Sequence, residues 1–155
     1  MPSPERPTFA LDENFPQPIL REAIDRYVLG IELVPLADLD PSLLGAYQDH
    51  ELIRELARRA IQGLITCDDN MIFLPEVLNA IKRTGISVVT CRRVGDDPVR
   101  ASGLLLVHLP DVAKRHKEGT PQVWRLGTVE SKPLKFAEHR RQVVGRVHRP
   151  PRTGK

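Results

Sequence analysis

The sequence predicts an α/β protein, a three-layer α/β/α sandwich with a mostly parallel central sheet. Short apolar segments alternate with helix-like patterns along the 155 residues. Several apolar segments are too uniformly hydrophobic for a sheet with one wet face. The alternation is βαβαβαβα, and right-handed crossovers between parallel strands place helices on both faces of a sheet. Because no internal repeat occurs and the length suits one domain, we expect a single core.

The first three predicted elements span residues 8–36. Residues 8–11 are an apolar run that stops at Asp12, which predicts a buried strand followed by a polar turn. Apolar residues then recur at helical spacing over 19–28, and Gly30 is placed to end this helix. Residues 31–36 are the second predicted strand.

The middle of the chain predicts a loop, a helix and a central strand. Residues 38–47 contain Pro and Gly and form a loop with room for one helical turn. The helical pattern over 49–61 closes at Gly63. The inner, apolar face of this helix consists of Leu52, Ile53, Leu56, Ala60 and Ile61. The outer, charged face consists of Glu51, Arg54, Glu55, Arg58 and Arg59. Residues 64–67 are a short, wholly buried strand.

The remaining pattern predicts a helix over 73–81 that ends before Gly85, a strand over 86–91, a helix from Asp97 to about His116, and an edge strand over 122–126. No periodicity is evident after that strand. The predicted organisation is an N-terminal extension (1–7), a domain (8–119), and an edge strand with a basic C-terminal tail (120–155).

Charge is unevenly distributed along the chain. Residues 1–113 hold 11 Lys and Arg against 17 Asp and Glu, whereas residues 114–155 hold 12 against 3. A basic tail suits a polyanion, because Lys and Arg release counterions when they neutralise phosphates. The expected nucleic-acid-binding residues are Arg140, Arg141, Arg146 and Arg149. A solubilising tail is the alternative interpretation.

Several function classes receive no support from the sequence. There is no apolar segment of signal-peptide or membrane-spanning length, so we expect no membrane association and a cytoplasmic location. Cys67 and Cys91 lack CxxC or zinc-type spacing, which indicates buried thiols in a reducing compartment. The P-loop, dinucleotide and nucleophile-elbow motifs are absent from the sequence.

Carboxylates follow two of the predicted strands and open one helix. Asp12 follows the first strand, Asp68 follows the third, and Asp49 with Glu51 begins the helix between the second and third strands. The carboxyl ends of parallel strands line the functional crevice of such sheets. Clustered like charges destabilise the ionised fold, and Mg²⁺ relieves this through hard oxygen ligands. The pattern predicts metal-assisted phosphodiester hydrolysis.

Each of these residues also has a purely structural interpretation. Asp12, Asp49 and Asp68 suit helix caps and turns. Thr66 can orient a ligand or water, or be an ordinary strand threonine. His50 can contact substrate or face solvent, and Trp124 can stack on a base or lie partly buried in the edge strand.

Three stretches resemble a known family. Residues 9–16, 49–53 with Ala57, and 64–70 resemble the LDEN-x-P opening, the D-x-E-I/L helix start and the T-x-D-x-D strand end of the small VapC-type toxin ribonuclease branch of the PIN-like domain family. The resemblance covers residues 8 to about 113. It implies an α/β/α sandwich and an Mg²⁺- or Mn²⁺-dependent endoribonuclease, often the toxin of a toxin-antitoxin pair. RNA, a cognate antitoxin and a homodimer are the implied partners.

The resemblance assigns roles residue by residue. Asp12, Asp49 (with Glu51 as competitor) and Asp68 match the family's first three acids, and are the expected catalytic and metal-binding residues. Asn70 stands where a fourth acid is common, which removes one negative charge. The expected auxiliary residues are Asn14, Glu51, Thr66 and Asn70.

Two other functions compete with the nuclease. A receiver-like phospho-accepting domain also needs acids after strand one, an Asp after strand three and a Thr after strand four, near Thr90. It lacks an obvious lysine after a fifth strand and leaves Asp49 unused. A non-catalytic RNA-binding protein with a degenerate site is the third possibility, because the fourth acid is missing.

Overall fold

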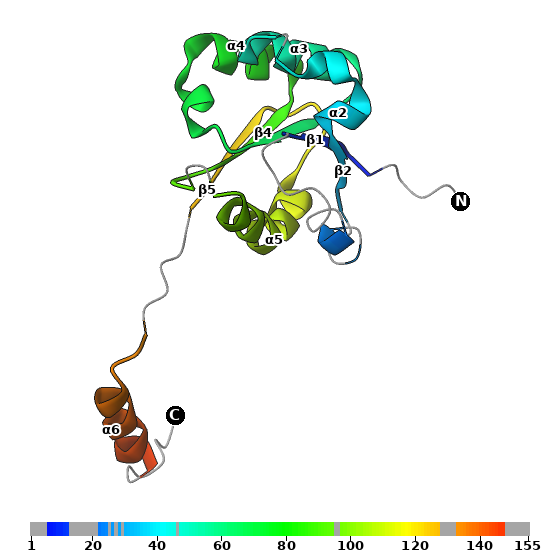
Figure 1. Cartoon of the computed structure of the whole chain (residues 1–155). Coiled ribbons are helices and arrows are strands. Elements are labelled where there is room, and N and C mark those ends of the chain that lie inside the picture. The colour runs from blue at the N-terminus through cyan, green and yellow to red at the C-terminus, as the bar shows by residue number, and fades with distance from the viewer. Residues whose placement is uncertain are drawn as a thin grey trace, which may run out of the picture.

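A computed structural model describes residues 6–12, 22–24, 26, 28, 30–45, 47–94, 97–127 and 133–147. Five parallel strands form one sheet in the order β2-β1-β3-β4-β5 (Figure 1). The strands are β1 (Thr8–Leu11), β2 (Glu32–Pro35), β3 (Gly63–Thr66), β4 (Ser87–Cys91) and β5 (Gln122–Leu126). The predicted α/β class, parallel sheet, central strand and edge strand are confirmed.

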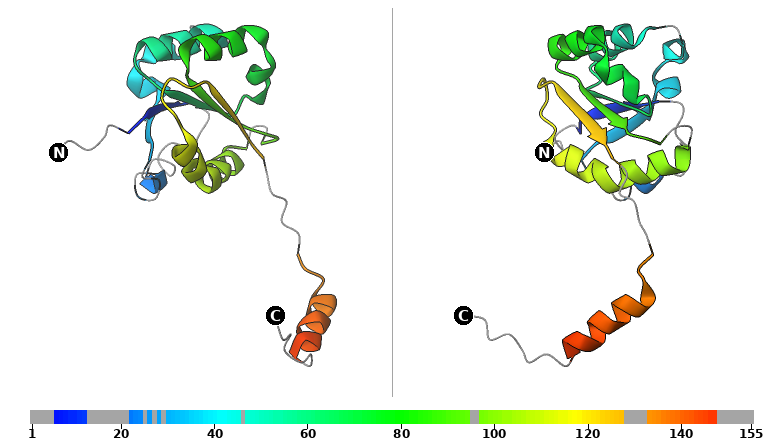
Figure 2. Two further views of the ribbon diagram at one scale, coloured as in Figure 1. Left: turned by 180° about the vertical axis from the view of Figure 1, so that it is seen from behind. Right: turned by 90° about the vertical axis from the view of Figure 1, so that its left-hand side faces the viewer.

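Helices cover both faces of this sheet (Figures 1 and 2). The α-helices are α2 (Leu36–Leu39), α3 (Asp49–Arg58), α4 (Pro75–Thr84), α5 (Pro98–Arg115) and α6 (Phe136–Val147), and the 3₁₀ helices are η1 (Pro41–Leu43) and η2 (Asp69–Phe73). Because strand side chains alternate between faces, Phe9 and Leu11 pack in the α5 layer and Ala10 packs in the α3/α4 layer. None of the described helices has the length and apolarity needed to cross a bilayer.

The strand order reverses between β1 and β3. The chain that leaves β1 crosses to the α5 layer, where Ile24 and Val28 are buried. The chain that leaves β3 crosses to the opposite layer through η2 and α4, where Met71 and Val77 are buried. The two connections therefore diverge at the carboxyl ends of β1 and β3, which is where an open α/β sheet forms its binding crevice.

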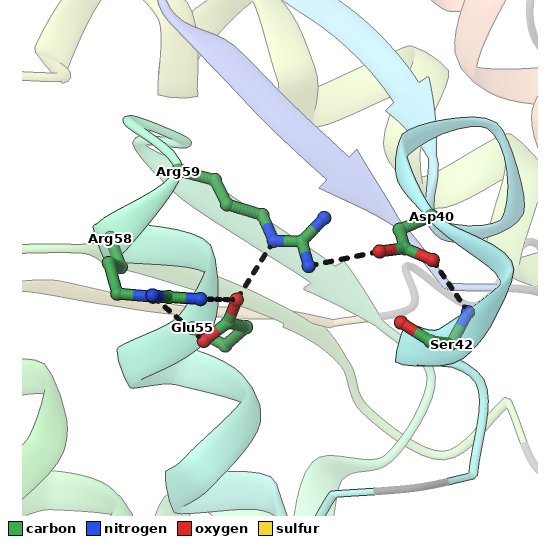
Figure 3. Close-up of polar contacts among 5 residues, drawn as sticks. All are labelled: Asp40, Ser42, Glu55, Arg58 and Arg59. Carbon is green, nitrogen blue, oxygen red and sulfur yellow. Dashed lines mark hydrogen bonds and ion pairs between the residues drawn. The ribbon is translucent and has the colours of Figure 1, made fainter.

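The helix predicted over 49–61 ends at Arg58, so its predicted closure at Gly63 is wrong. The chain leaves the helix through Ala60, whose φ of 60° is left-handed. Glu55, predicted to lie on the solvent-facing side of this helix, makes ion pairs instead. It accepts hydrogen bonds from both Arg58 and Arg59, and Arg59 also pairs with Asp40 (Figure 3). These contacts fasten the end of α3 to the loop at η1.

The segment predicted as one helix over 73–81 is two helices. Residues Asp69–Phe73 form η2, and α4 begins at Pro75, whose missing N–H is tolerated in a first turn. The Phe73 side chain, expected on the buried face, is 61% exposed. The end of α4 is as predicted, because Gly85 caps it with a φ of 71°.

The C-terminal region differs most from the sequence prediction. Strand β5 pairs with β4 along its whole length, so the sheet extends to Leu126. Residues Phe136–Val147 form helix α6 although no periodicity was evident there, and α6 stands apart from the sandwich (Figures 1 and 2). Helix α6 keeps apolar side chains exposed, including Phe136, Val143 and Val144. A helix without a buried face leaves no amphipathic pattern to detect.

A partly buried polar network lies at the amino-terminal ends of β3 and β4. The His116 Nδ1 lies 3.0 Å from Ser87 Oγ and its Nε2 lies 3.0 Å from Gln62 Oε1. The imidazole also meets the Phe9 ring edge to face, with centroids 5.1 Å apart. Because Gln62 Oε1 can only accept, Nε2 carries the proton and Nδ1 accepts from the Ser87 hydroxyl. Burial lowers the pKa of His116, so the folded protein holds it neutral.

Because the pKa of His116 is lowered by folding, the free energy of unfolding should decrease as the pH falls. Stability from the neutral imidazole is complete above the ordinary pKa of 6.5 and is lost as the pH falls through the lower folded pKa. Between pH 7.5 and 5, thermal unfolding should show a larger loss of melting temperature for the wild type than for His116→Gln. His139→Gln, on exposed α6, should follow the wild type. Parallel losses in wild type and His116→Gln would contradict the assignment.

Candidate acidic site at the strand switch point

Three predicted acids lie just after β1, just after β3 and at the start of α3. Asp12 directly follows β1, and its N–H donates to the Ile65 carbonyl of β3 at 3.0 Å. Asp68 follows β3 after one intervening residue, and Asp49 is the first residue of α3. We call Asp12, Asp49 and Asp68 the three-acid site. Its members come from two neighbouring strand ends and one helix start.

Thr66 connects two of these acids. Its Oγ1 donates to Asp12 Oδ2 at 3.0 Å, and it accepts from the Asp68 backbone N–H at 3.1 Å. Thr66 is buried, at 4% exposure, so its hydroxyl is held in place by strand packing. The hydroxyl that was expected to be auxiliary therefore fixes the orientation of the Asp12 carboxylate and the path of the chain at Asp68.

The negative charges of Asp12 and Asp68 act on the Asp49 carboxyl. Burial is the largest cause that raises the pKa of the Asp49 carboxyl, and the negative charges of Asp68 and Asp12 raise it further. His50 opposes this rise in the pKa of Asp49. Carboxylates influence one another in this way only at short range. The fold therefore places Asp12 and Asp68, which lie 37 and 19 positions from Asp49 in the sequence, within electrostatic range of the Asp49 carboxyl.

Two of the other predicted auxiliary residues, Glu51 and Asn70, make local hydrogen bonds. Glu51 accepts from the Gln48 N–H at 3.3 Å and so faces the start of its own helix. Asp49, rather than Glu51, is the α3 acid that the charges of Asp12 and Asp68 affect. The exposed Asn70 donates its N–H to Asp68 Oδ1 at 3.1 Å, which makes Asp68 the cap of η2. Asn14 lies outside the described residues.

Sequence reasoning missed an ion-pair cluster next to the three-acid site. Arg125 of β5 donates to both carboxylate oxygens of Asp69, with Nε at 2.9 Å from each and Nη2 at 2.5 Å from Oδ2. Thr90 of β4 donates to Asp69 Oδ1 at 3.0 Å, and the Arg125 guanidinium also lies over the Phe73 ring at 5.1 Å. The Arg125 hydrogen bonds are the main cause that lowers the pKa of Asp69. The negative charge of Asp69 is thus compensated by the positive charge of Arg125. The cluster also holds η2, which begins directly after Asp68, against β4 and β5.

The donor chemistry of the three-acid site fits a hard divalent cation. Mg²⁺ usually binds through one or two protein carboxylates together with waters and substrate phosphate oxygens. Within the described part of the chain, which includes Asp12, Asp49 and Asp68, no three or more His, Cys, Asp or Glu side chains form a group that could hold a metal ion. Burial and the Asp12 charge raise the pKa of Cys67 to about 11, so this neighbouring thiol stays protonated at neutral pH.

Helix α6, which carries three of the four predicted nucleic-acid-binding residues, lies apart from the sheet in Figures 1 and 2. Arg140, Arg141 and Arg146 lie on α6, and all three side chains are exposed. Arg149 lies outside the described residues. Trp124 is half-buried and packs against the α5 layer of the core, as its structural interpretation expects.

Comparisons with protein-family models, with curated proteins and with solved structures find no match to this chain.

Proposed function

We propose that this protein is a metal-dependent endoribonuclease that hydrolyses RNA phosphodiester bonds at the three-acid site. The observation that supports it most is the effect of the Asp12 and Asp68 charges on Asp49, at the strand switch point. Negative charges that act on the Asp49 carboxyl disfavour its ionised form, and a cation bound there would relieve this repulsion. The resemblance to the VapC-type branch points to the same chemistry.

In this proposal Asp12, Asp49 and Asp68 would hold Mg²⁺ or Mn²⁺. A cation bound there would supply Lewis-acid stabilisation of phosphate charge and would acidify water. Thr66 keeps the Asp12 carboxylate oriented through its 3.0 Å hydrogen bond, which limits the rearrangement needed on binding. Asp49, at the start of α3, would add the third carboxylate to this set.

The test is a cleavage assay on the full chain with end-labelled single-stranded RNA and DNA of the same sequence. Cleavage of RNA is expected with Mg²⁺ or Mn²⁺ and should stop when EDTA is added. If the protein binds RNA but does not cleave it with either Mg²⁺ or Mn²⁺, the nuclease proposal is wrong and a non-catalytic RNA-binding function takes its place. In that case α6, with Arg140 and Arg141 exposed, would supply the affinity.

The toxin role and the location belong to the same proposal. A toxin of this kind acts on cytoplasmic RNA, is held inactive by a cognate antitoxin and forms a homodimer. A neighbouring gene for a small DNA-binding protein that co-purifies with the chain and blocks cleavage would support the toxin role. Unchanged cleavage in the presence of that protein would count against it.

One observation favours a receiver-like domain as the second candidate. The strand order 2-1-3-4-5 is that of flavodoxin-like folds, which include receiver domains, and Asp68 is exposed after the central strand. However, the Thr90 hydroxyl bonds Asp69 rather than Asp68, and a paired arginine, Arg125, is the cation contributed by β5. Incubation with a small phosphodonor followed by intact-mass measurement separates the two, because an 80 Da adduct on Asp68 is expected only of a receiver.

A further inference from the structure

A hollow of about 290 Å³ lies beside the three-acid site, between the first turns of α3 and α4. It is lined by Gln48, Asp49, His50, Leu74, Glu76 and Val77. Asp49 thus borders both the hollow and the three-acid site. A group bound in the hollow would be the immediate neighbour of anything held at the three acids.

The lining combines an apolar floor with polar groups at its rim. Leu74, which is 40% exposed, supplies the apolar surface, and the fully buried Val77 packs beneath it. His50 is half-buried and contributes a flat aromatic ring, whereas Gln48 and Glu76 are exposed. The volume lies at the low end of the range of about 300–1,000 Å³ for small-molecule sites. This combination suits one flat, uncharged ring system with hydrogen-bonding edges.

The two carboxylates select among the chemical groups that could enter. Asp49 and Glu76 repel phosphate, so the hollow does not suit the RNA backbone itself. An ionised carboxylate only accepts hydrogen bonds, so a base must present N–H donors to Glu76. Guanine presents two N–H groups side by side, N1–H and N2–H, whereas each other base presents a single N–H-bearing group on that edge. One carboxylate can therefore accept two parallel bonds from guanine alone.

We propose that this hollow is a nucleobase subsite that takes guanine next to the phosphodiester held at the three-acid site. The base stacks on the His50 ring and the apolar floor, and Glu76 accepts from its N1–H and N2–H. Unpaired bases in RNA are commonly recognised by such stacking together with hydrogen bonds to one base edge. This inference rests on the proposed function, because it places the base of a bound RNA.

The experiment measures binding apart from cleavage. Fluorescent eight-nucleotide oligouridylates, each with one central G, A, C or U, are titrated with the full chain in Ca²⁺, and a gel confirms that the RNA stays intact. The wild type should bind the G-containing RNA about tenfold more tightly than the others, the size of one good bidentate pair. Glu76→Gln should reduce this preference to below about threefold, because an amide offers one acceptor and one donor group.

A matched control is Glu32→Gln, since Glu32 is equally exposed but lies at the start of β2, at the other end of the strands. It should retain the full preference for G, and thermal melting should show all three proteins folded. Equal affinity of the wild type for the four RNAs, no RNA binding, or an undiminished G preference in Glu76→Gln would each overturn the subsite. A lysine- or arginine-rich peptide that binds the hollow in place of RNA, with loss on Glu76→Gln, would reassign it to a cationic partner.

The outcomes also separate this inference from the nuclease. A G preference that depends on Glu76, without cleavage in Mg²⁺ or Mn²⁺, would support the subsite and refute catalysis. Cleavage with no base preference would support catalysis and refute the subsite.

Discussion

Asp12→Asn and Asp68→Asn are each expected to lower metal-dependent RNA cleavage by about 10²–10³-fold, or below detection, while the protein stays folded. Each change removes one negative charge from the three-acid site and replaces an oxygen ligand with an amide group, which weakens cation binding. The measurement is the single-turnover cleavage rate with Mg²⁺ or Mn²⁺ in excess, on protein free of contaminating nuclease.

The asparagine side chain preserves the local hydrogen bonds. Asp12 Oδ2 accepts from Thr66, and Asp68 Oδ1 accepts from the Asn70 N–H, and an amide oxygen can accept in both places. A loss of activity would therefore reflect charge and ligand chemistry rather than unfolding. Asp111→Asn, at an exposed position of α5, is the matched control and should keep full activity. Full activity in both site variants would refute the assignment of the three acids.

Gly63→Ala is expected to destabilise the fold by about 1–3 kcal/mol or more, because an added Cβ has no room. A Cβ built at Gly63 would lie 2.4–2.6 Å from three atoms of the Phe9 ring. Phe9 pairs in register with Gly63 on the neighbouring strand and is fully buried, and His116 packs on its ring edge to face. The ring therefore cannot move aside without disturbing β1, which carries Asp12 at its end.

Denaturant unfolding of Gly63→Ala beside Gly103→Ala checks this explanation. Gly103 lies in α5, and a Cβ there would meet nothing within 4 Å. Gly103→Ala should therefore stabilise the protein by about 0.5–1 kcal/mol through helix propensity. If both variants have the stability of the wild type, the close packing of Phe9 on Gly63 is not what limits that position.

The strands and two of the site acids were predictable from sequence for a single physical reason. Parallel buried strands are short apolar runs, and their carboxyl ends share one edge of the sheet. An acid that directly follows such a run, as Asp12 follows β1, must therefore lie near that edge. Asp68 follows the same rule after β3. Asp49 was predictable because an acid at the start of a helical pattern lies in the first turn.

The rest of the site depends on contacts that leave no local pattern. Arg125 and Asp69 are 56 positions apart, and only the pairing of β5 with β4 brings them together. The predicted C-terminal segment, residues 120–155, is therefore not only a basic tail. Its first part is β5, which completes the sheet and carries Arg125. The hollow lined by His50 and Glu76 likewise depends on how α3 and α4 pack, which residue spacing in either helix does not specify.

The central claim is that Asp12, Asp49 and Asp68 share a divalent cation, and thermal unfolding during titration with Mg²⁺ or Mn²⁺ tests it most directly. A cation that binds only the folded form stabilises it by about 2.7 kcal/mol at a hundred times its Kd. We predict that the melting temperature of the wild type rises progressively with cation concentration. The melting temperature of the Asp12→Asn/Asp68→Asn double variant should not rise. A wild type that does not respond, or a double variant that responds equally, would contradict the account.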